Sequence, residues 1–408
     1  MKRVAMLSAL LISTTLTAGA VETPVGFDGQ TNGMVNQATH DANRETFDEV
    51  ETIEDGLGPV YNAQSCRECH QNPVSGGASQ VSELRVGHAV RGRFENPVVP
   101  INNGKDTITG RSLINDRAIC AQAQERVPAG NPIRTFRMSL NLLGDGFIEA
   151  VADATLEALA RRNGGLALKV PILEAPGQGA IGRFGWKAQH ASLLSFSADA
   201  YLNEMGITNR LQPDEVTAVC QPPDVAQPND QANDIEKFAT FMRATKAPPR
   251  DEIQAATPEA KHGERLFERI GCERCHTATM RTAPAGTKIN GGTFTIPEAL
   301  GDKVFHPYSD FLLHDVGTGD GIGIAVAEHF GAQAGYMPRA AVDKTANRLR
   351  TPPLWGVRLR TRLMHDGANA TFFDAIRRHA GEARGEARRF DRLPDHKQNA
   401  LIAFLRSL

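Results

Sequence analysis

The chain has 408 residues, which is enough for two or three domains with apolar cores of their own. Its 45 Lys and Arg residues nearly balance its 47 Asp and Glu residues, which argues against nucleic acid or an anionic membrane as the main partner. Hydrophobic residues make up 41% of the chain, and no stretch after residue 20 is apolar for long enough to span a membrane. We therefore expect a soluble body with no stable membrane insertion.

Residues 1–20 have the composition of an export signal. Two basic residues, Lys2 and Arg3, precede an apolar run that ends near Leu16, and the small residues 18–20 suit a signal peptidase. We interpret this segment as a signal peptide that is removed on export to the periplasm. The alternative is an uncleaved anchor, which the shortness of the apolar run disfavours.

Four of the six cysteines lie in two copies of the pentapeptide Cys-x-x-Cys-His. A redox dithiol or a zinc site also uses Cys-x-x-Cys pairs, but neither requires the histidine that follows both pairs. Covalent attachment of haem does require it, because the thiols bind the vinyl groups and the histidine binds the iron. We therefore expect two c-type haems, with a structural zinc site as the main alternative. The attachment residues are Cys66, Cys69, Cys272 and Cys275, and the iron ligands are His70 and His276.

The segments around the first motif predict few regular elements. Residues 25–60 hold few apolar residues and are expected to wrap the first domain, and residues 100–180 contain several Gly and Pro breaks. The sequence DATLEALARR, at 153–162, predicts one helix, and strand-like alternation is sparse. Cys120 and Cys220 are the two cysteines outside the motifs, and they form either a disulfide or two buried free thiols.

A stretch rich in Pro, Asn and Asp at 220–234 predicts a connecting loop, and the domain boundary is expected after the next helix, near residues 245–255. A helix follows, with Ile235, Phe238 and Met242 on one face, and it ends before Pro248. One haem motif lies on each side of this boundary. The predicted organisation is a signal peptide at 1–20, an N-terminal haem domain at 21–250 and a C-terminal cytochrome-c-like domain at 251–408.

The second half of the chain has the clearer helical patterns. Leu266, Phe267 and Ile270 recur at helical spacing just before Gly271 and the second haem motif, which is typical of the first helix of a cytochrome c. A capping pattern starting at Thr371 and an apolar stripe at 401–408 predict two further helices. We therefore predict a mainly α fold of two cytochrome-c-like helical domains with long loops and one covalent haem in each.

The sixth ligand of each iron separates an electron carrier from an enzyme, because a strong ligand closes the iron and an open position admits peroxide or oxygen. For the second haem, Met364 is the best candidate, since a thioether ligand typically lies well downstream of the haem motif. His365 and Met337 are its rivals.

Several motifs together resemble those of the bacterial di-haem oxidoreductase family whose members are named as peroxidases. They are GPVYNAQSCRECH, GRFGWKAQ, NEMGITN, HPYSDFLLHDVGTGDG and RTPPLWGV followed by LMHDG. The family is a distant relative of the di-haem cytochrome c peroxidases and of the di-haem enzyme that matures methylamine dehydrogenase. The resemblance runs from about residue 25 to the C-terminus.

This resemblance implies roles for individual residues. Met364 would ligate the electron-transfer haem, and the haem on His70 would then be the site of chemistry. Glu204, in Glu-Met-Gly, matches a distal glutamate that moves a proton during cleavage of the peroxide bond. Trp186 matches an aromatic relay between the haems. The segment SLLSFSAD, at 193–200, lacks the glutamine that the relatives have before that glutamate.

Two further expectations concern a metal and a resting ligand. The relatives hold a calcium ion between the haems, partly through carbonyls of a Thr-x-Pro stretch, which Thr351 begins here. A histidine outside the motifs is a candidate to close the first iron at rest, and we rank His190 ahead of His88, His306 and His314 because it lies near Trp186 and Glu204 in the sequence.

The expected function is a periplasmic di-haem oxidoreductase that reduces hydrogen peroxide. A small cytochrome c or a cupredoxin would donate the electrons at the C-terminal haem. One alternative is a non-catalytic electron carrier, in which both irons stay six-coordinate. The other is an oxidase or oxygenase that acts on a protein or polymer partner through the same haems.

Overall fold

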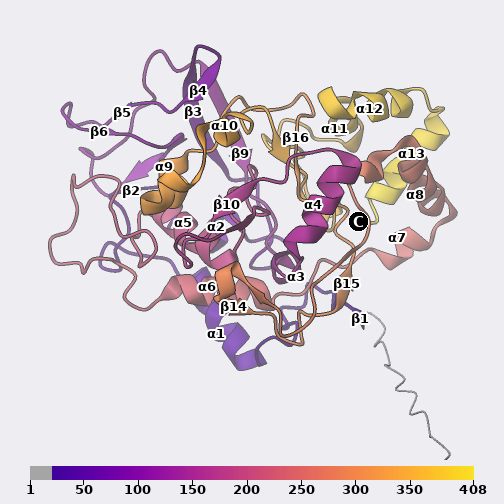
Figure 1. The fold of residues 1–408 in the computed structure, drawn as a ribbon, viewed down its shortest axis with the longest axis horizontal. Coiled ribbons are helices and arrows are strands. Elements are labelled where there is room, and N and C mark those ends of the chain that lie inside the picture. The colour runs from indigo at the N-terminus through magenta and orange to yellow at the C-terminus, as the bar shows by residue number, and fades with distance from the viewer. Residues whose placement is uncertain (1–20) are drawn as a thin grey trace, which may run out of the picture.

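The computed structural model describes residues 21–408, so the predicted signal peptide lies outside the described residues (Figure 1). Within this range, no helix combines the length and the apolar composition that crossing a membrane requires. The α-helices are α1 Gln37–Asp48, α2 Cys66–Cys69, α3 Asp145–Glu149, α4 Asp153–Asn163, α5 Leu193–Met205, α6 Asp234–Ala244, α7 Glu252–Ala256, α8 Pro258–Ile270, α9 Val326–Phe330, α10 Arg339–Asp343, α11 Phe372–Arg377, α12 Arg384–Asp391 and α13 Asp395–Leu405. Short 3₁₀ helices are η1 Cys272–Arg274, η2 Asn290–Gly292, η3 Gly331–Tyr336, η4 Val357–Leu359 and η5 Gly381–Ala383.

The strands are mostly two or three residues long, and they form several small sheets rather than one layer. They are β1 Val21–Glu22, β2 Val60–Tyr61, β3 Ser82–Val90, β4 Arg93–Glu95, β5 Val99–Pro100, β6 Thr107–Ile108, β7 Leu113–Ile114, β8 Arg117–Ala118, β9 Ile133–Met138, β10 Lys169–Pro171, β11 Gly179–Ile181, β12 Met280–Arg281, β13 Lys288–Ile289, β14 Phe294–Thr295, β15 Lys303–Phe305, β16 Leu313–His314 and β17 Leu349–Arg350. The largest sheet has the order β4-β3-β7, and β9 also pairs with β3.

The prediction of a mainly α fold is wrong. Only 33% of the structure is helical, and 16% is strand. Two cytochrome-c-like helical domains therefore do not describe the chain, because a mixed region with many small sheets lies between the two haem motifs. The long loops of the prediction are present, but short strand pairs run through them.

The longest strand pair, β3 with β9, shows why an alternation of apolar and polar residues does not reveal these strands in the sequence. β3 and β9 run antiparallel, with Ser82 opposite Met138 and Gly87 opposite Ile133. Both faces of the pair are partly buried, with Val86 and Met138 on one face and Arg85 and Arg137, each only 4% exposed, on the other. Both guanidinium groups are buried because carboxylates from distant parts of the chain neutralise them. A binary hydrophobic pattern does not reveal such a strand.

Most of the individual helix predictions are confirmed. The DATLEALARR pattern forms α4, and the apolar face of Ile235 and Phe238 lies on α6. α8 ends at Gly271, which has a φ of 95°, a backbone conformation that favours glycine. Thr371 caps α11 by accepting a hydrogen bond from the Asp374 backbone amide. Helices α8 and α11–α13 gather at one end of the molecule around an apolar cluster of their own (Figure 1).

The largest apolar core takes residues from both sides of the predicted domain boundary. It joins Phe147 and Phe241 to Phe305, Phe311 and Trp355. The N-terminal strand β1 also pairs in parallel with β15, which lies almost 300 residues later. The division at residue 250 stays a prediction, but the side chains on its two sides share one interior.

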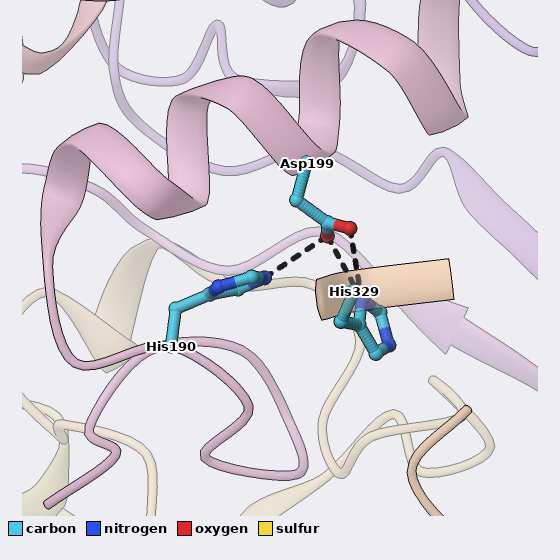
Figure 2. A group of neighbouring side chains, drawn as sticks. All are labelled: His190, Asp199 and His329. Atoms are coloured by element: carbon cyan, nitrogen blue, oxygen red, sulfur yellow. Dashed lines mark hydrogen bonds and ion pairs between the residues drawn. The ribbon is translucent and has the colours of Figure 1, made fainter. Parts of the chain in front are cut away.

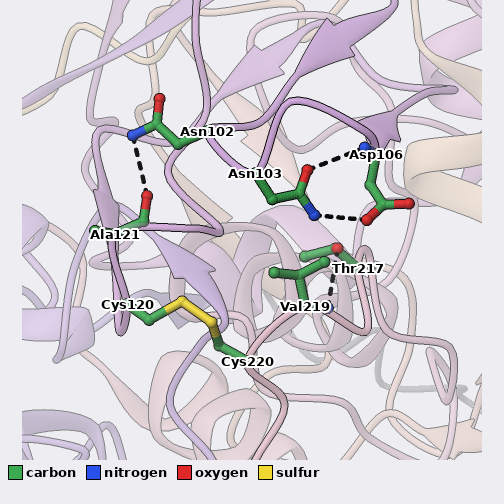
Figure 3. Close-up of a disulfide and its surroundings, with 8 residues drawn as sticks. All are labelled: Asn102, Asn103, Asp106, Cys120, Ala121, Thr217, Val219 and Cys220. Atoms are coloured by element: carbon green, nitrogen blue, oxygen red, sulfur yellow. Dashed lines mark hydrogen bonds between the residues drawn. A yellow bond between two sulfur atoms is a disulfide. The ribbon is translucent and has the colours of Figure 1, made fainter.

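Cys120 and Cys220 form a disulfide that closes a loop with a sequence separation of 100 (Figure 3). Both half-cystines pack against a small apolar cluster around β3, β5 and β7. Of the two alternatives that the sequence left open, the structure has the disulfide. Such a bridge suits a chain exported to an oxidising compartment.

We expect the double variant Cys120→Ser with Cys220→Ser to unfold at a lower urea concentration. A cross-link of a long loop restricts the unfolded chain, so its loss should lower the free energy of unfolding by about 2–4 kcal/mol. Urea titration followed by circular dichroism, with and without a reductant, measures the change. The reductant should shift the wild type and leave the double variant unchanged, and a double variant as stable as the wild type would contradict the expectation.

Candidate functional site

The first haem motif forms the short helix α2, which Ser65 caps by accepting a hydrogen bond from the Arg67 amide. The Cys66 side chain packs against the main apolar core. His70 Nδ1 lies 3.2 Å from the Gly77 carbonyl oxygen, and burial lowers the pKa of His70 to about 4. Nδ1 therefore donates to that carbonyl from a neutral ring, which leaves Nε2 free to bind a metal.

The second motif has the same arrangement. His276 Nδ1 lies 3.0 Å from the Tyr308 carbonyl oxygen, and burial lowers the pKa of His276 to about 4. Each motif thus offers two thiols and one oriented, neutral imidazole. This is the donor set that a covalently attached haem needs, so the residues fit the group.

A cavity of about 990 Å³ lies beside the second motif. Cys272, Cys275 and His276 line one part of it, and the apolar side chains of α8, α11 and α13 line another. Asn72 and Leu140, which flank the first motif in the structure, also line this cavity. The space therefore reaches from the second motif to the surroundings of the first, and it is large and apolar enough for a macrocycle.

Met364 lines the same cavity as His276, as the predicted ligand pair requires. Its backbone has a φ of 67°, which is uncommon for a residue with a side chain and costs of order 1–3 kcal/mol. The turn is held by Asp366, which pairs with the Arg378 guanidinium at 2.5 Å. His365, the neighbouring rival, also lines the cavity, whereas Met337 does not.

We expect Met364→Ala to lower the reduction potential of the second haem, since a thioether ligand favours ferrous iron. Spectroelectrochemical titration of the holoprotein measures the potential. Met337→Ala is the matched control because that methionine is also buried but lies outside the cavity lining. A drop in the control alone would assign the ligand to Met337 instead.

Trp186 borders the same cavity and is 8% exposed. Its Nε1 donates a hydrogen bond to the Met138 carbonyl at 2.8 Å, and its ring lies edge-on to His365 at 6.2 Å between centroids. The indole is therefore fixed next to the residue that follows Met364. The relay role of Trp186 stays a prediction.

Glu204 lies at the C-terminal end of α5, next to the segment that leads into the first haem motif. The backbone carbonyl of Glu204 accepts hydrogen bonds from the amides of Asn62 and Ala63 at 2.7 and 3.1 Å. Gly206 ends the helix with a φ of 71°, and a Cβ there would lie 2.7 Å from the Val60 carbonyl oxygen. Only glycine allows this close approach, so the Glu-Met-Gly sequence fastens the glutamate beside the motif.

The Glu204 carboxyl group forms a pair with Glu83, from β3. Burial raises the pKa of Glu204 well above its usual range, and the neighbouring Glu83 charge adds to the increase. Burial also disfavours the charged form of Glu83, but the Arg85 guanidinium outweighs it and lowers the pKa of Glu83 to about 2. Of the two carboxyl groups, Glu204 is therefore the one that binds a proton more readily.

The pair lies close to the first haem motif. Burial raises the pKa of the Cys69 thiol to about 12, and the largest charge contribution to this increase comes from Glu204. Asn62 Nδ2 donates a hydrogen bond of 2.8 Å to Glu204 Oε2, which orients the carboxyl group. The Glu204 residue as a whole is half-buried.

Sequence reasoning missed the partners of Glu204. Glu83 and Arg85 lie on β3, and Glu328 on α9 forms an ion pair with Arg85 from more than 240 residues away. No periodicity or motif connects these residues, because the strand pairing that brings them together was not predicted. Residues 193–200, where the relatives have a glutamine, contain none in this chain, so no glutamine side chain from this segment joins the group.

The remaining predicted residues lie elsewhere. His190 contacts Asp199, His88 contacts Asn131, and His306 is exposed beside Glu22. His314 lines the second haem cavity next to Cys275. The Thr351 carbonyl, proposed as a calcium ligand, accepts a hydrogen bond of 2.6 Å from Ser309 Oγ, and calcium stays a prediction.

The chain belongs to the di-haem oxidoreductase family. The family model described as "Di-haem oxidoreductase, putative peroxidase" matches residues 124–408, which is most of the chain and includes the second haem motif. The family description names two haems, and the chain has two haem motifs. No curated protein matches the sequence.

Three solved structures are similar over nearly the full length. Hydrazine synthase of Kuenenia stuttgartiensis is 13% identical, covers all of both chains and has a TM-score of 0.40. A MauG-like protein associated with microbial copper homeostasis is 14% identical, with 97% and 95% of the two chains covered and a TM-score of 0.42. The di-haem peroxidase BthA of Burkholderia thailandensis is 16% identical, with 91% and 86% covered and a TM-score of 0.34.

Proposed function

We propose that this member of the family is an exported c-type di-haem peroxidase, which reduces hydrogen peroxide to water in the periplasm. A small cytochrome c or a cupredoxin supplies two electrons per peroxide, and two protons are taken up as the O–O bond breaks. The family assignment and the two attachment motifs support the cofactors and the class of reaction. The disulfide between Cys120 and Cys220 supports an oxidising compartment.

In this proposal the two haem motifs have different roles. Cys66 and Cys69 would attach the first haem and Cys272 and Cys275 the second, with His70 and His276 as iron ligands. Bound haem iron supplies the electrons and the position at which peroxide binds. Met364 would hold the iron of the second haem through its sulfur, and the second haem would then transfer electrons without binding peroxide. Trp186 is assigned as the aromatic relay, which its position on the cavity wall next to His365 supports.

The observation that carries the proposal is the carboxyl pair of Glu204 and Glu83 beside the first motif. Heterolysis of peroxide requires one proton to move from the inner to the outer oxygen. In its ionised form, Glu204 accepts the proton from the inner oxygen, and it then donates that proton to the leaving oxygen as water forms. Asn62 orients the carboxyl group through its 2.8 Å hydrogen bond.

Half-reduction of the holoprotein tests the proposal against an electron carrier. We expect a high-spin haem signal to develop when the second haem alone is reduced, and we expect peroxide to oxidise reduced cytochrome c in the presence of the protein. Two permanently low-spin haems without peroxide turnover would overturn the proposal. Turnover of an organic or polymer substrate without oxidation of the reduced cytochrome would assign an oxidase instead.

A further inference from the structure

A buried cluster of two histidines and one aspartate lies outside the haem sites (Figure 2). His190 precedes α5, Asp199 lies on α5, and His329 lies on α9. The three side chains point toward one another, and one ligand atom of each lies within 4.8 Å of the others. Their exposed fractions are 0%, 6% and 2%, respectively, so the cluster is closed to bulk solvent.

Ordinary hydrogen bonds do not account for the position of His190. Its Nε2 lies 3.1 Å from Asp199 Oδ2, but the contact lacks hydrogen-bond geometry. Nδ1 of the same ring is buried without any partner. An unpaired polar atom in the interior is unfavourable, so an imidazole with both nitrogens unsatisfied needs an explanation. His190 Nε2 is aimed at the carboxylate and at the space beside it.

His329 approaches the same carboxylate from the other side. Its Nδ1 lies 2.9 and 3.0 Å from the two carboxylate oxygens, so the nitrogen is centred between them rather than aligned with one. Metal–ligand bonds of about 2.1 Å place neighbouring ligand atoms about 3.0 Å apart in octahedral coordination and about 3.4 Å apart in tetrahedral coordination. The distances from Asp199 to both rings, between 2.9 and 3.1 Å, agree with the octahedral spacing.

We propose that His190, Asp199 and His329 bind one divalent transition-metal ion of the zinc or ferrous iron class, distinct from the two haem irons. Two imidazoles and one carboxylate suit ions of this class, whereas calcium prefers oxygen ligands alone and cuprous copper prefers sulfur. The ligand atoms are His190 Nε2, one or both Asp199 oxygens and His329 Nδ1.

The surroundings resemble the outer shell of a metal site. Asn203 Nδ2 donates a hydrogen bond of 3.0 Å to Asp199 Oδ1, which fixes the carboxylate, as such partners do around bound metals. Phe196 and Phe330 pack against the His190 ring at 5.8 and 6.0 Å between centroids and keep water out.

The metal would join two helices that also carry Glu204 and the ion-pair partner of Arg85. α5 bears both Asp199 and Glu204, and α9 bears both His329 and Glu328, the ion-pair partner of Arg85. A bound ion holds α9 against α5 and so fixes Arg85 beside Glu83. The proposed role of the ion is structural, and it does not depend on whether peroxide is the substrate.

Metal analysis of the holoprotein tests this inference without any activity assay. Total metals from mass spectrometry are compared with the haem content from the pyridine haemochrome. We expect about one equivalent of non-haem divalent transition metal per chain in the wild type. Asp199→Asn and His329→Gln should lose it and keep both haems, while His40→Gln should retain it, because His40 is a buried histidine that packs on Phe241 instead.

A second measurement covers the case in which the variants do not fold. Wild-type holoprotein is treated with a chelator and dialysed against a low concentration of zinc chloride, and we expect it to take up one equivalent and to melt at a higher temperature as a result. A folded, haem-loaded wild type that neither contains nor takes up non-haem metal would overturn the proposal. Equal metal contents in the wild type and Asp199→Asn would overturn it as well.

Discussion

Replacement of Glu204 by Gln should reduce the kcat/KM for peroxide by about 10²–10⁴-fold, which is the usual contribution of a positioned general acid–base group. The amide keeps the shape of the side chain and its hydrogen bond to Asn62, but it neither accepts the peroxide proton nor delivers it. Peroxide-dependent oxidation of a reduced cytochrome measures the loss, and the haem spectra should be unchanged. Glu215→Gln is the matched control, because burial also raises the pKa of that carboxyl group, to about 8, away from the pair.

Replacement of Glu83 by Gln should affect the pH profile rather than remove activity. The negative charge of Glu83 raises the pKa of Glu204, second only to burial, so its removal lowers that pKa. Proton acceptance requires ionised Glu204, and the acidic limb of kcat/KM against pH should therefore move to lower pH. A structural role alone would lower activity at every pH without moving the limb, and that result would contradict the assignment of the pair.

Loss of the Glu149 charge should give the largest fall in stability. Glu149, 1% exposed at the end of α3, accepts hydrogen bonds from Arg243 Nε and Nη2 at 2.6 and 2.9 Å. It also accepts from the Leu193 amide and from Asn290 Nδ2, and so joins four segments. Glu149→Gln leaves the buried guanidinium uncompensated, and the free energy of unfolding should fall by about 3–5 kcal/mol.

Urea unfolding followed by circular dichroism measures this fall. Glu157→Gln is the control, since Glu157 forms an exposed ion pair with Arg161 at 4.0 Å on α4, and a change of less than about 0.5 kcal/mol is expected. Equal changes in the two variants would mean that burial of the Arg243 charge carries no penalty.

The sequence predicted those parts of the molecule that depend on local patterns. Spacing alone located both haem motifs, and the apolar stripe before Gly271 located α8. These two inferences need only residues within one element or one motif. Met364 was proposed from its position downstream of the second motif and from the family resemblance; it lies on the cavity wall beside His276, and its role as a ligand stays a prediction.

The parts that failed depend on contacts between distant segments. The sequence pattern does not predict β3 and β9, because Arg85 and Arg137 occupy one of the two buried faces of the pair. The carboxylates that neutralise these arginines come from α9 and from Asp320. The pairing of Glu83 with Glu204 depends on the position of β3, which the sequence does not predict. The contact between the His190 ring and Asp199 is likewise not visible from the sequence, and the candidacy of His190 as a resting iron ligand stays a prediction.

The pairing of β1 with β15 bears on attempts to divide the protein. A gene cut at residue 250 would leave Lys303–Phe305 without the strand at Val21–Glu22 and would uncover Phe305 and Trp355 to water. Neither fragment would then keep its apolar interior covered, so separate single-haem halves should aggregate on expression. Spectroscopy of one cofactor at a time is better served by removing the cysteines of one motif within the intact polypeptide.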